Sequence, residues 1–327
     1  MTAAVTFVCC VEAGPLELMT ARMIASLRRW GGRFAAAPVL AVTPRRGPQL
    51  LPETHELFQE YGVRYVRYPV REQFSWNNFM NKPHALLLAE QEAETPCLAW
   101  LDSDILILGE PGQLALEATE AFAACAPDKN VGTAGPEDVN DPYWRQLGQA
   151  LQVEVERLPW IVTAADRQKI RLYFNSGVFV FRREMHFAAA FLEACRSILQ
   201  ARISSKQAGI FFTDQVALGL TAFRLGLPYR LLDHDHNFAV GSKSLEALVP
   251  EKVREVKILH HHDAMWPPLW PRLLEVLRET HPEVYRWLQP LGPLTNPRRG
   301  FGRVYLKVLQ AVRSWQQQQF VKTCHSY

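Results

Sequence analysis

The stretch that decides the fold is Cys97-Leu98-Ala99-Trp100-Leu101-Asp102-Ser103-Asp104-Ile105-Leu106-Ile107-Leu108. Apolar residues fill both halves of this run, and two carboxylates interrupt it at positions i and i+2. Apolar runs of this length and type are typical of a strand buried on both faces, as in an α/β sheet. The sequence therefore predicts a buried strand that bends at Ser103, where it leaves the sheet.

The two acids, Asp102 and Asp104, need partners there. Burying an ionised carboxylate costs several kcal/mol unless it is paired or binds a metal. Strand residues two apart point to the same side, so we interpret the pair as facing one crevice. A hard divalent cation that carries phosphates suits such a crevice. The alternative is a pair of turn aspartates between two short strands, because Asp-x-Asp is common by chance.

Strand and helix patterns alternate before this run. Strands are expected at residues 5–11, 38–43 and 63–68, with helices at 16–30 and 52–61. This alternation predicts βαβ units and a mainly parallel sheet. Ligands of such sheets bind beyond the carboxyl ends of the strands. We therefore expect the turn at 12–15 and the Asp-Ser-Asp segment at the same rim.

Composition limits the class of protein. The chain has 327 residues, of which 48% are hydrophobic, enough for one large domain or two. A net charge of +3 is no argument for nucleic acid, and no such partner is expected. The six cysteines form no Cys-x-x-Cys pair and are interpreted as buried thiols of a reducing compartment. No signal peptide and no run of about 18 apolar residues is found, so a cytoplasmic protein is expected.

Residues 79–90 read as a loop that enters a helix, with Lys82 near the helix N-terminus. A lysine at a helix N-terminus suits a phosphate, and a solvated lysine is the alternative. The pattern loosens over residues 109–171, with one strand expected at 121–126 and loops at 132–136 and 138–144. Long irregular segments often form lids or binding loops, so acceptor contacts are expected there.

Polar residues interrupt three later segments. Asn175-Ser176-Gly177 breaks an aromatic strand pattern, where the glycine permits the close approach of another backbone or a ligand, or marks a bulge. Asn175 can both donate and accept, which suits a sugar hydroxyl. Either Thr213 or Asp214 can cap the next helix, and a catalytic role for Asp214 is the alternative. A strand at 256–259 ends in three histidines, of which at most one or two can serve a metal site.

In this order the motifs resemble the GT-A glycosyltransferases, and most closely family 8, which includes glycogenin and bacterial galactosyltransferases. The resemblance covers roughly residues 3–270 and rests on Lys82-Pro83-His84, Asp102-Ser103-Asp104, Asn175-Ser176-Gly177, Asp214-Gln215 and Ile258-Leu259-His260. It implies the GT-A fold, an α/β architecture with a mainly parallel mixed sheet flanked by helices. After the histidine, family 8 usually carries a glycine and then a lysine. Here Asp263 and Trp266 occupy those places, so the lysine is absent.

The resemblance also implies roles. Asp104 would bind Mn²⁺ or Mg²⁺, Asp102 would be shared between the metal and the ribose, and His260 would be the third protein ligand. Lys82 and Asn175 would contact the donor sugar or its phosphates. Asp214 or Gln215 would lie beside the anomeric carbon. The implied reaction moves a hexose, with retention, from a UDP-sugar to a glycan, lipid or protein acceptor.

Two other functions are weighed. A nucleotidyltransferase that makes the sugar nucleotide would share the sheet, but residues 12–15 lack the glycine-rich basic loop of such enzymes. A non-catalytic binding protein on this fold would be expected to lose costly buried groups such as the Asp-Ser-Asp pair and His260.

The chain is predicted to divide into a GT-A-like catalytic domain at 1–270 and a C-terminal helical extension at 271–327. Helices are expected at 272–288, broken at Pro282, and at 303–319, with a linker at 292–297. From residue 297 onward there is no acid, while Arg and Lys recur among apolar residues. Such a segment can contact a membrane peripherally at the cytoplasmic face. The alternative is a helix docked on the protein itself.

Overall fold

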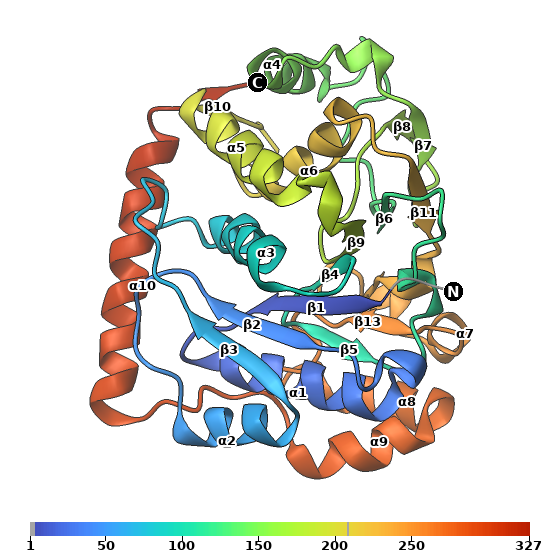
Figure 1. The fold of residues 1–327 in the computed structure, drawn as a ribbon, viewed down its shortest axis with the longest axis vertical. Coiled ribbons are helices and arrows are strands. Elements are labelled where there is room, and N and C mark those ends of the chain that lie inside the picture. Colours follow the sequence, from blue (N-terminus) through green and yellow to red (C-terminus); the bar gives the residue numbers. More distant parts are fainter. Residues whose placement is uncertain (1–3, 208) are drawn as a thin grey trace.

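The computed structural model describes residues 4–207 and 209–327, and its helices lie on both sides of a central sheet (Figure 1). Seven strands form this sheet in the order β11-β6-β9-β4-β1-β2-β3. They are β1 (Val5–Cys10), β2 (Val39–Thr43), β3 (Val63–Arg67), β4 (Cys97–Leu101), β6 (Phe122–Cys125), β9 (Val178–Arg182) and β11 (Tyr229–Leu232). Strand β9 runs antiparallel to both of its neighbours, β4 and β6, and the other neighbours are parallel. The predicted mainly parallel mixed sheet is confirmed.

Helices cover both faces of the sheet because its strands β2, β4 and β6 are buried at every position. In β1, Val8 joins the core beneath α3 and α5, whereas Val5 and Phe7 join the core beneath α1. Successive strand residues point to opposite faces, so each face needs its own cover. One face carries α3 (Asn81–Glu92), α4 (Asp141–Leu151), α5 (Phe187–Gln200) and α6 (Thr213–Arg224), and the other carries α1 (Pro15–Trp30) and α2 (Pro52–Glu60) (Figure 1).

Three smaller sheets lie outside the central one. The largest joins β5 (Ile105–Ile107), β12 (Phe238–Ala239) and β13 (Ile258–His260). The others pair β7 (Trp160–Val162) with β8 (Lys169–Arg171), and β10 (Ile203–Ser204) with β14 (His325–Ser326). The three-stranded sheet shares a core with α7 (Pro250–Val253), α8 (Trp270–Thr280) and α9 (Pro282–Leu288). Helices on both sides of residue 270 thus pack together, and the predicted division there stays a prediction.

The decisive run, residues 97–108, forms two strands and not one. Strand β4 belongs to the central sheet, whereas β5 pairs with β13 in the three-stranded sheet. Between them the chain turns, and the hydroxyl of Ser103 donates to the carbonyl oxygen of Cys10 at 2.6 Å. Both halves of the run are buried because each lies inside its own sheet. The predicted bend at Ser103 is correct, and the prediction of a single continuous strand is wrong.

Other predicted boundaries differ in places. The five early segments form β1, α1, β2, α2 and β3 within one or two residues of expectation. Residues 138–144 were expected to be a loop, but α4 begins at Asp141, since Tyr143, Trp144 and Leu147 bury one helical face. Helix α5 begins at Phe187, directly after His186, which adopts a left-handed conformation with φ 50°.

The C-terminal helix α10 (Gly300–Val321) lies along one side of the molecule, next to the loops at the ends of β2 and β3 (Figure 1). Arg298, just before it, pairs with the buried Glu17 at 2.7 Å. Near its end, the ring of Phe320 packs 4.9 Å from that of Trp76. The helix is therefore docked on the protein. No helix within the described residues is long and apolar enough to cross a membrane.

Candidate active site

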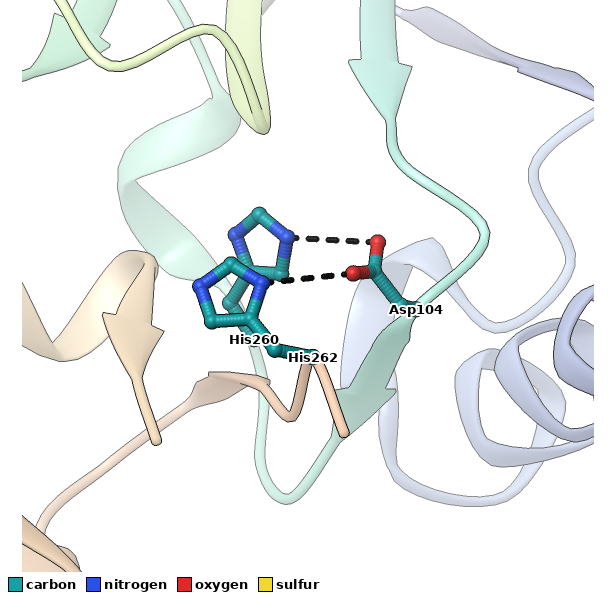
Figure 2. Close-up of side chains that lie close together, drawn as sticks. All are labelled: Asp104, His260 and His262. Atoms are coloured by element: carbon teal, nitrogen blue, oxygen red, sulfur yellow. Dashed lines mark hydrogen bonds and ion pairs between the residues drawn. The ribbon is translucent and has the colours of Figure 1, made fainter. Parts of the chain in front are cut away.

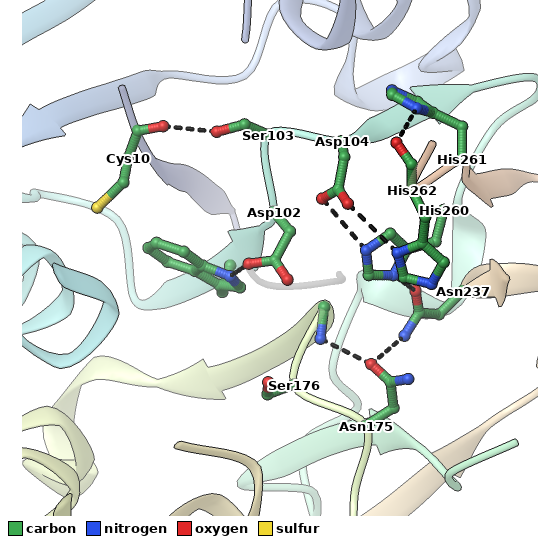
Figure 3. A network of polar contacts seen from close by, with 12 residues as sticks. Cys10, Asp102, Ser103, Asp104, Asn175, Ser176, Asn237, His260, His261 and His262 are labelled. Carbon is green, nitrogen blue, oxygen red and sulfur yellow. Dashed lines mark hydrogen bonds and ion pairs between the residues drawn. The ribbon is translucent and has the colours of Figure 1, made fainter. Parts of the chain in front are cut away.

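The candidate site lies where the chain leaves β4, beside the residues that lead into β9 (Figure 3). The two acids of the turn have different partners. Asp102 accepts a hydrogen bond from the indole nitrogen of Trp100 at 2.6 Å and lies 3.3 Å from Lys82 Nζ. Asp104 faces the histidines at the end of β13. The two acids therefore have different partners: Asp102 pairs with Lys82, and Asp104 pairs with the histidines.

Asp104, His260 and His262 form a cluster whose ligand atoms all lie within 4.8 Å of one another (Figure 2). The two oxygens of Asp104 lie 3.2 Å from His260 Nε2 and 3.3 Å from His262 Nδ1. Two imidazoles and one carboxylate suit a divalent transition metal, whereas Mg²⁺ prefers oxygen ligands. The donor set therefore fits a divalent cation, and the choice between Mn²⁺ and Mg²⁺ stays a prediction. Asp102 lies outside this set, and its predicted share in the metal stays a prediction.

His262 was not predicted as a ligand, although the run of three histidines contained the signal. Its side chain is partly exposed, whereas that of His260 is buried. Between them, His261 donates its backbone N–H to the Asp104 carbonyl oxygen at 2.9 Å. The side chain of His261 is buried, and burial lowers its pKa to about 4. Two of the three histidines, His260 and His262, thus face the carboxylate of Asp104, in agreement with the expectation that at most two can serve one site.

A chain of hydrogen bonds orients the ring of His260 (Figure 3). The side-chain amide of Asn237 donates to Asn175 Oδ1 at 2.8 Å, which leaves its own oxygen to accept from His260 Nδ1 at 3.0 Å. Gly177 N–H also donates to Asn175 Oδ1, at 2.8 Å. Nδ1 of His260 therefore carries a proton, and Nε2 faces Asp104 Oδ1 at 3.2 Å. Such outer partners fix the tautomer of a metal-binding histidine.

Gly177 is required by this packing. A Cβ atom at this position would lie 2.6 Å from Cε1 and 2.7 Å from Nδ1 of His260. The glycine therefore permits a close approach, but the group that approaches is the side chain of His260 and not, as was predicted, another backbone or a ligand. Sequence reasoning missed Asn237, whose only signal was its place in a polar segment before β12.

Lys82 is a buried cation and not a solvated one. Its ammonium lies 2.8 Å from Asp214 Oδ2, and it donates to the carbonyl and hydroxyl oxygens of Ser176 at 2.8 and 2.9 Å. Burial disfavours the charged amine, but the carboxylates of Asp102 and Asp214 outweigh this and raise the pKa of Lys82. A fixed positive charge therefore lies between the turn after β4 and the start of α6.

Asp214 and Gln215 begin α6, but neither Thr213 nor Asp214 caps it. The helix starts at Thr213 and carries no side-chain cap, so the capping explanation is wrong. Asp214 is 2% exposed, and no residue in the described part of the chain bonds its Oδ1 atom. Gln215 is only partly buried and accepts from the hydroxyl of Tyr173 at 2.9 Å. Asp214 thus positions Lys82, and Gln215 is the more accessible of the two.

The two turn acids also differ electrostatically. Burial favours the neutral form of both carboxyl groups. For Asp104, the neighbouring His260 and His262 outweigh burial and hold its pKa well below the usual range. For Asp102, burial prevails over the attraction of Lys82, and the pKa is raised. Asp104 is therefore the more firmly ionised of the two acids, and an ionised carboxylate is the form that can bind a cation.

The sheet order, the Asp-Ser-Asp turn at a strand end and the histidine beside it define a GT-A-like glycosyltransferase fold. The sequence profile of the Rhodobacterales glycosyltransferase domain matches residues 7–226, about two thirds of the chain. The chain belongs to this family, and it is a glycosyltransferase.

Solved structures are similar at the level of the fold. The apo structure of the WbbM bifunctional glycosyltransferase matches 88% of this chain and 52% of its own, with 14% identity and a TM-score of 0.51. The apo crystal structure of mouse xyloside xylosyltransferase 1 matches 80% of this chain and 98% of its own, with 14% identity and a TM-score of 0.44. None of the curated proteins compared with this chain matches it.

Proposed function

We propose that this glycosyltransferase is metal-dependent and moves a hexose from a nucleotide-sugar donor, a UDP-sugar, to a glycan, lipid or protein acceptor. The observation that carries the proposal is the Asp104, His260 and His262 cluster at the same rim as the buried Lys82. A match to a glycosyltransferase family favours sugar transfer over the nucleotidyltransferase and binding-protein alternatives. We further propose that the site is of the family 8 type.

The residues at the rim suit the charge that develops during transfer. A departing nucleoside diphosphate gains negative charge, and positive charge fixed beside it stabilises that change. Lys82, held by Asp214, supplies such a charge without having to move. Mn²⁺, held by Asp104, His260 and His262 with Asp102 nearby, would add a Lewis acid for the diphosphate. In this proposal, Lys82 and a metal ion held by the Asp104, His260 and His262 cluster would both stabilise the diphosphate.

The remaining proposed roles concern the sugar. We assign Asp102 to the ribose as well as the metal, and Asn175 to the donor sugar or its phosphates. Gln215 lies at the start of α6 with a partly exposed side chain, which supports a place beside the anomeric carbon. A polar group on that face would steady an oxocarbenium-like centre, so retention is proposed. Proton NMR of the first product from an α-linked donor tests this, and a β-linked product would contradict it.

The metal is tested by a screen of UDP-sugars for Mn²⁺-dependent hydrolysis or transfer. Asp104→Asn keeps the shape of the side chain but removes its charge, so activity should fall by at least about 100-fold, the scale of losing one key electrostatic group. His262→Asn should weaken Mn²⁺ binding as well. His234→Asn is the matched control, because His234 pairs with Asp128 away from the cluster. Near-normal transfer activity of the Asp104→Asn variant would contradict the proposed metal dependence.

We also propose a cytoplasmic location with peripheral membrane contact through the C-terminal extension. The absence of acids from residue 297 onward and the recurring Arg and Lys residues support this.

A further inference from the structure

A cavity of about 640 Å³ lies between α10 and the loops that follow β2 and β3. Four arginines line it: Arg45 and Arg46 after β2, Arg71 after β3, and Arg313 on α10. Its other walls include the ring of Trp76 and the apolar side chains of Val70, Leu309 and Val312. Four guanidinium groups around one cavity need anionic partners, because like charges repel at close range.

Two carboxylates of the protein lie near these arginines. Glu12 accepts from Arg45 Nη2 at 2.8 Å and lies 3.7 Å from Arg313 Nη1. Glu72 lines the cavity, but its carboxylate is 5% exposed and pairs with His84 and Arg196 instead. Across residues 4–207 and 209–327, no acidic side chain pairs with the guanidinium of Arg46 or Arg71. The cavity therefore holds an excess of positive charge.

The outer face of α10 carries an apolar stripe beside this cavity. Its members are Phe301, Val304, Tyr305, Val308, Val312 and Trp315, which are 45–86% exposed. Their spacing of three, four or seven residues places them on one side of a helix. Val312 belongs both to this stripe and to the wall of the cavity. No acid occurs between residue 297 and the C-terminus.

We propose that the arginine cavity binds the phosphate of an anionic phospholipid while the apolar stripe of α10 lies in the membrane interface. Guanidinium groups pair with phosphate through two parallel hydrogen bonds, and an aromatic and apolar stripe suits the headgroup boundary. The shared chemistry is a phosphate group, which soluble phosphates also offer, but the adjoining stripe selects the lipid. This inference rests on and deepens the proposed membrane contact of the C-terminal extension, and it does not depend on the proposed sugar transfer.

Membrane docking at this surface would bring the sugar-transfer rim near the bilayer. Glu12 follows β1, and its carboxylate accepts from Asn81 Nδ2 at 2.8 Å, one residue before Lys82. The arginine cavity and the candidate active site therefore lie along one edge of the central sheet. A lipid-linked or membrane-borne acceptor is the kind of substrate that this arrangement favours.

The test is sedimentation of the full-length protein with vesicles of phosphatidylcholine alone or of equal parts phosphatidylcholine and phosphatidylglycerol. Binding is expected only with phosphatidylglycerol and should weaken as salt is raised. Arg46→Gln with Arg71→Gln should weaken it roughly 30-fold, since each cation near an anionic surface contributes a factor of about five. Val308→Ser with Trp315→Ser should weaken it too. Arg254→Gln with Arg286→Gln removes two exposed arginines, one directly after α7 and one on α9, and should bind like the wild type.

Two results would overturn the proposal. One is an equal loss of vesicle binding in the Arg46→Gln, Arg71→Gln variant and in the Arg254→Gln, Arg286→Gln control. Equal losses would mean that net charge alone drives membrane binding. The other is a rise in melting temperature with inorganic pyrophosphate that depends on Arg46 and Arg71, without any vesicle binding. The cavity would then take a soluble phosphate. Metal-dependent hydrolysis of the donor should be unchanged in every variant, so failure here is distinguishable from failure of the proposed function.

Discussion

At the scale of single residues, the least conspicuous member of the site is Asn237. Its amide joins Asn175 to His260 and thereby orients the imidazole. Asn237→Ala should weaken Mn²⁺ binding about 10- to 100-fold, the usual cost of losing an outer partner of a metal ligand. Calorimetric titration of the full-length protein with Mn²⁺ measures this.

His236→Asn is a control for that titration. His236 is a neighbour in sequence, but it bonds Asp235 and the backbone of Gln113 and not the cluster. Unaltered Mn²⁺ affinity in Asn237→Ala would show that the ring of His260 needs no outer support.

At the scale of elements, helices α3 and α5 are tied together by buried charge. His84 on α3 and Arg196 on α5 both contact Glu72, at 3.1 and 2.8 Å. Burial lowers the pKa of His84 below its usual 6.5, and the attraction of Glu72 only partly offsets this. The folded protein therefore binds fewer protons at this site than the unfolded chain.

Stability should consequently fall as the pH drops below about 6.5, where unfolded histidine protonates, by at most about 1.4 kcal/mol per pH unit for one proton. Glu72 acts in a lower window: Arg196 outweighs burial and lowers its pKa, so its contribution is lost only below about pH 4.5. Urea unfolding between pH 7 and 5 should give a shallower pH slope for His84→Gln than for the wild type. Parallel slopes would contradict the assignment.

At the scale of the whole molecule, the C-terminal segment is joined to the first helix through Glu17. This carboxylate is 1% exposed and accepts from Arg298, from Leu51 N–H and from the hydroxyl of Thr54. Arg298→Ala removes its charged partner and should cost about 1–3 kcal/mol, the penalty for a buried acceptor left short of a partner. Thermal unfolding measures it, with the exposed neighbour variant Arg299→Ala as control. Equal melting temperatures of the two variants would mean that the ion pair adds nothing.

The sequence by itself determined the layered fold and the order of its motifs. Strands that are apolar at every position, such as β4, or nearly so, such as β1, must be buried on both faces, so a sheet between two helix layers follows from local pattern alone. The turn acids at a strand end could be predicted in the same way. These inferences depend on the spacing of neighbours along the chain, which the sequence displays directly.

Only the tertiary structure decided which side chains share the rim. His262 joins Asp104 across 158 residues, and Asp214 joins Lys82 across 132, so no local pattern reveals either contact. The same holds for the run at 97–108, which is one apolar pattern but two strands in two sheets. One long buried strand and two short buried strands would show the same apolar pattern. Contacts with distant segments separate the two: β5 pairs with β13, and Ser103 donates to the carbonyl oxygen of Cys10.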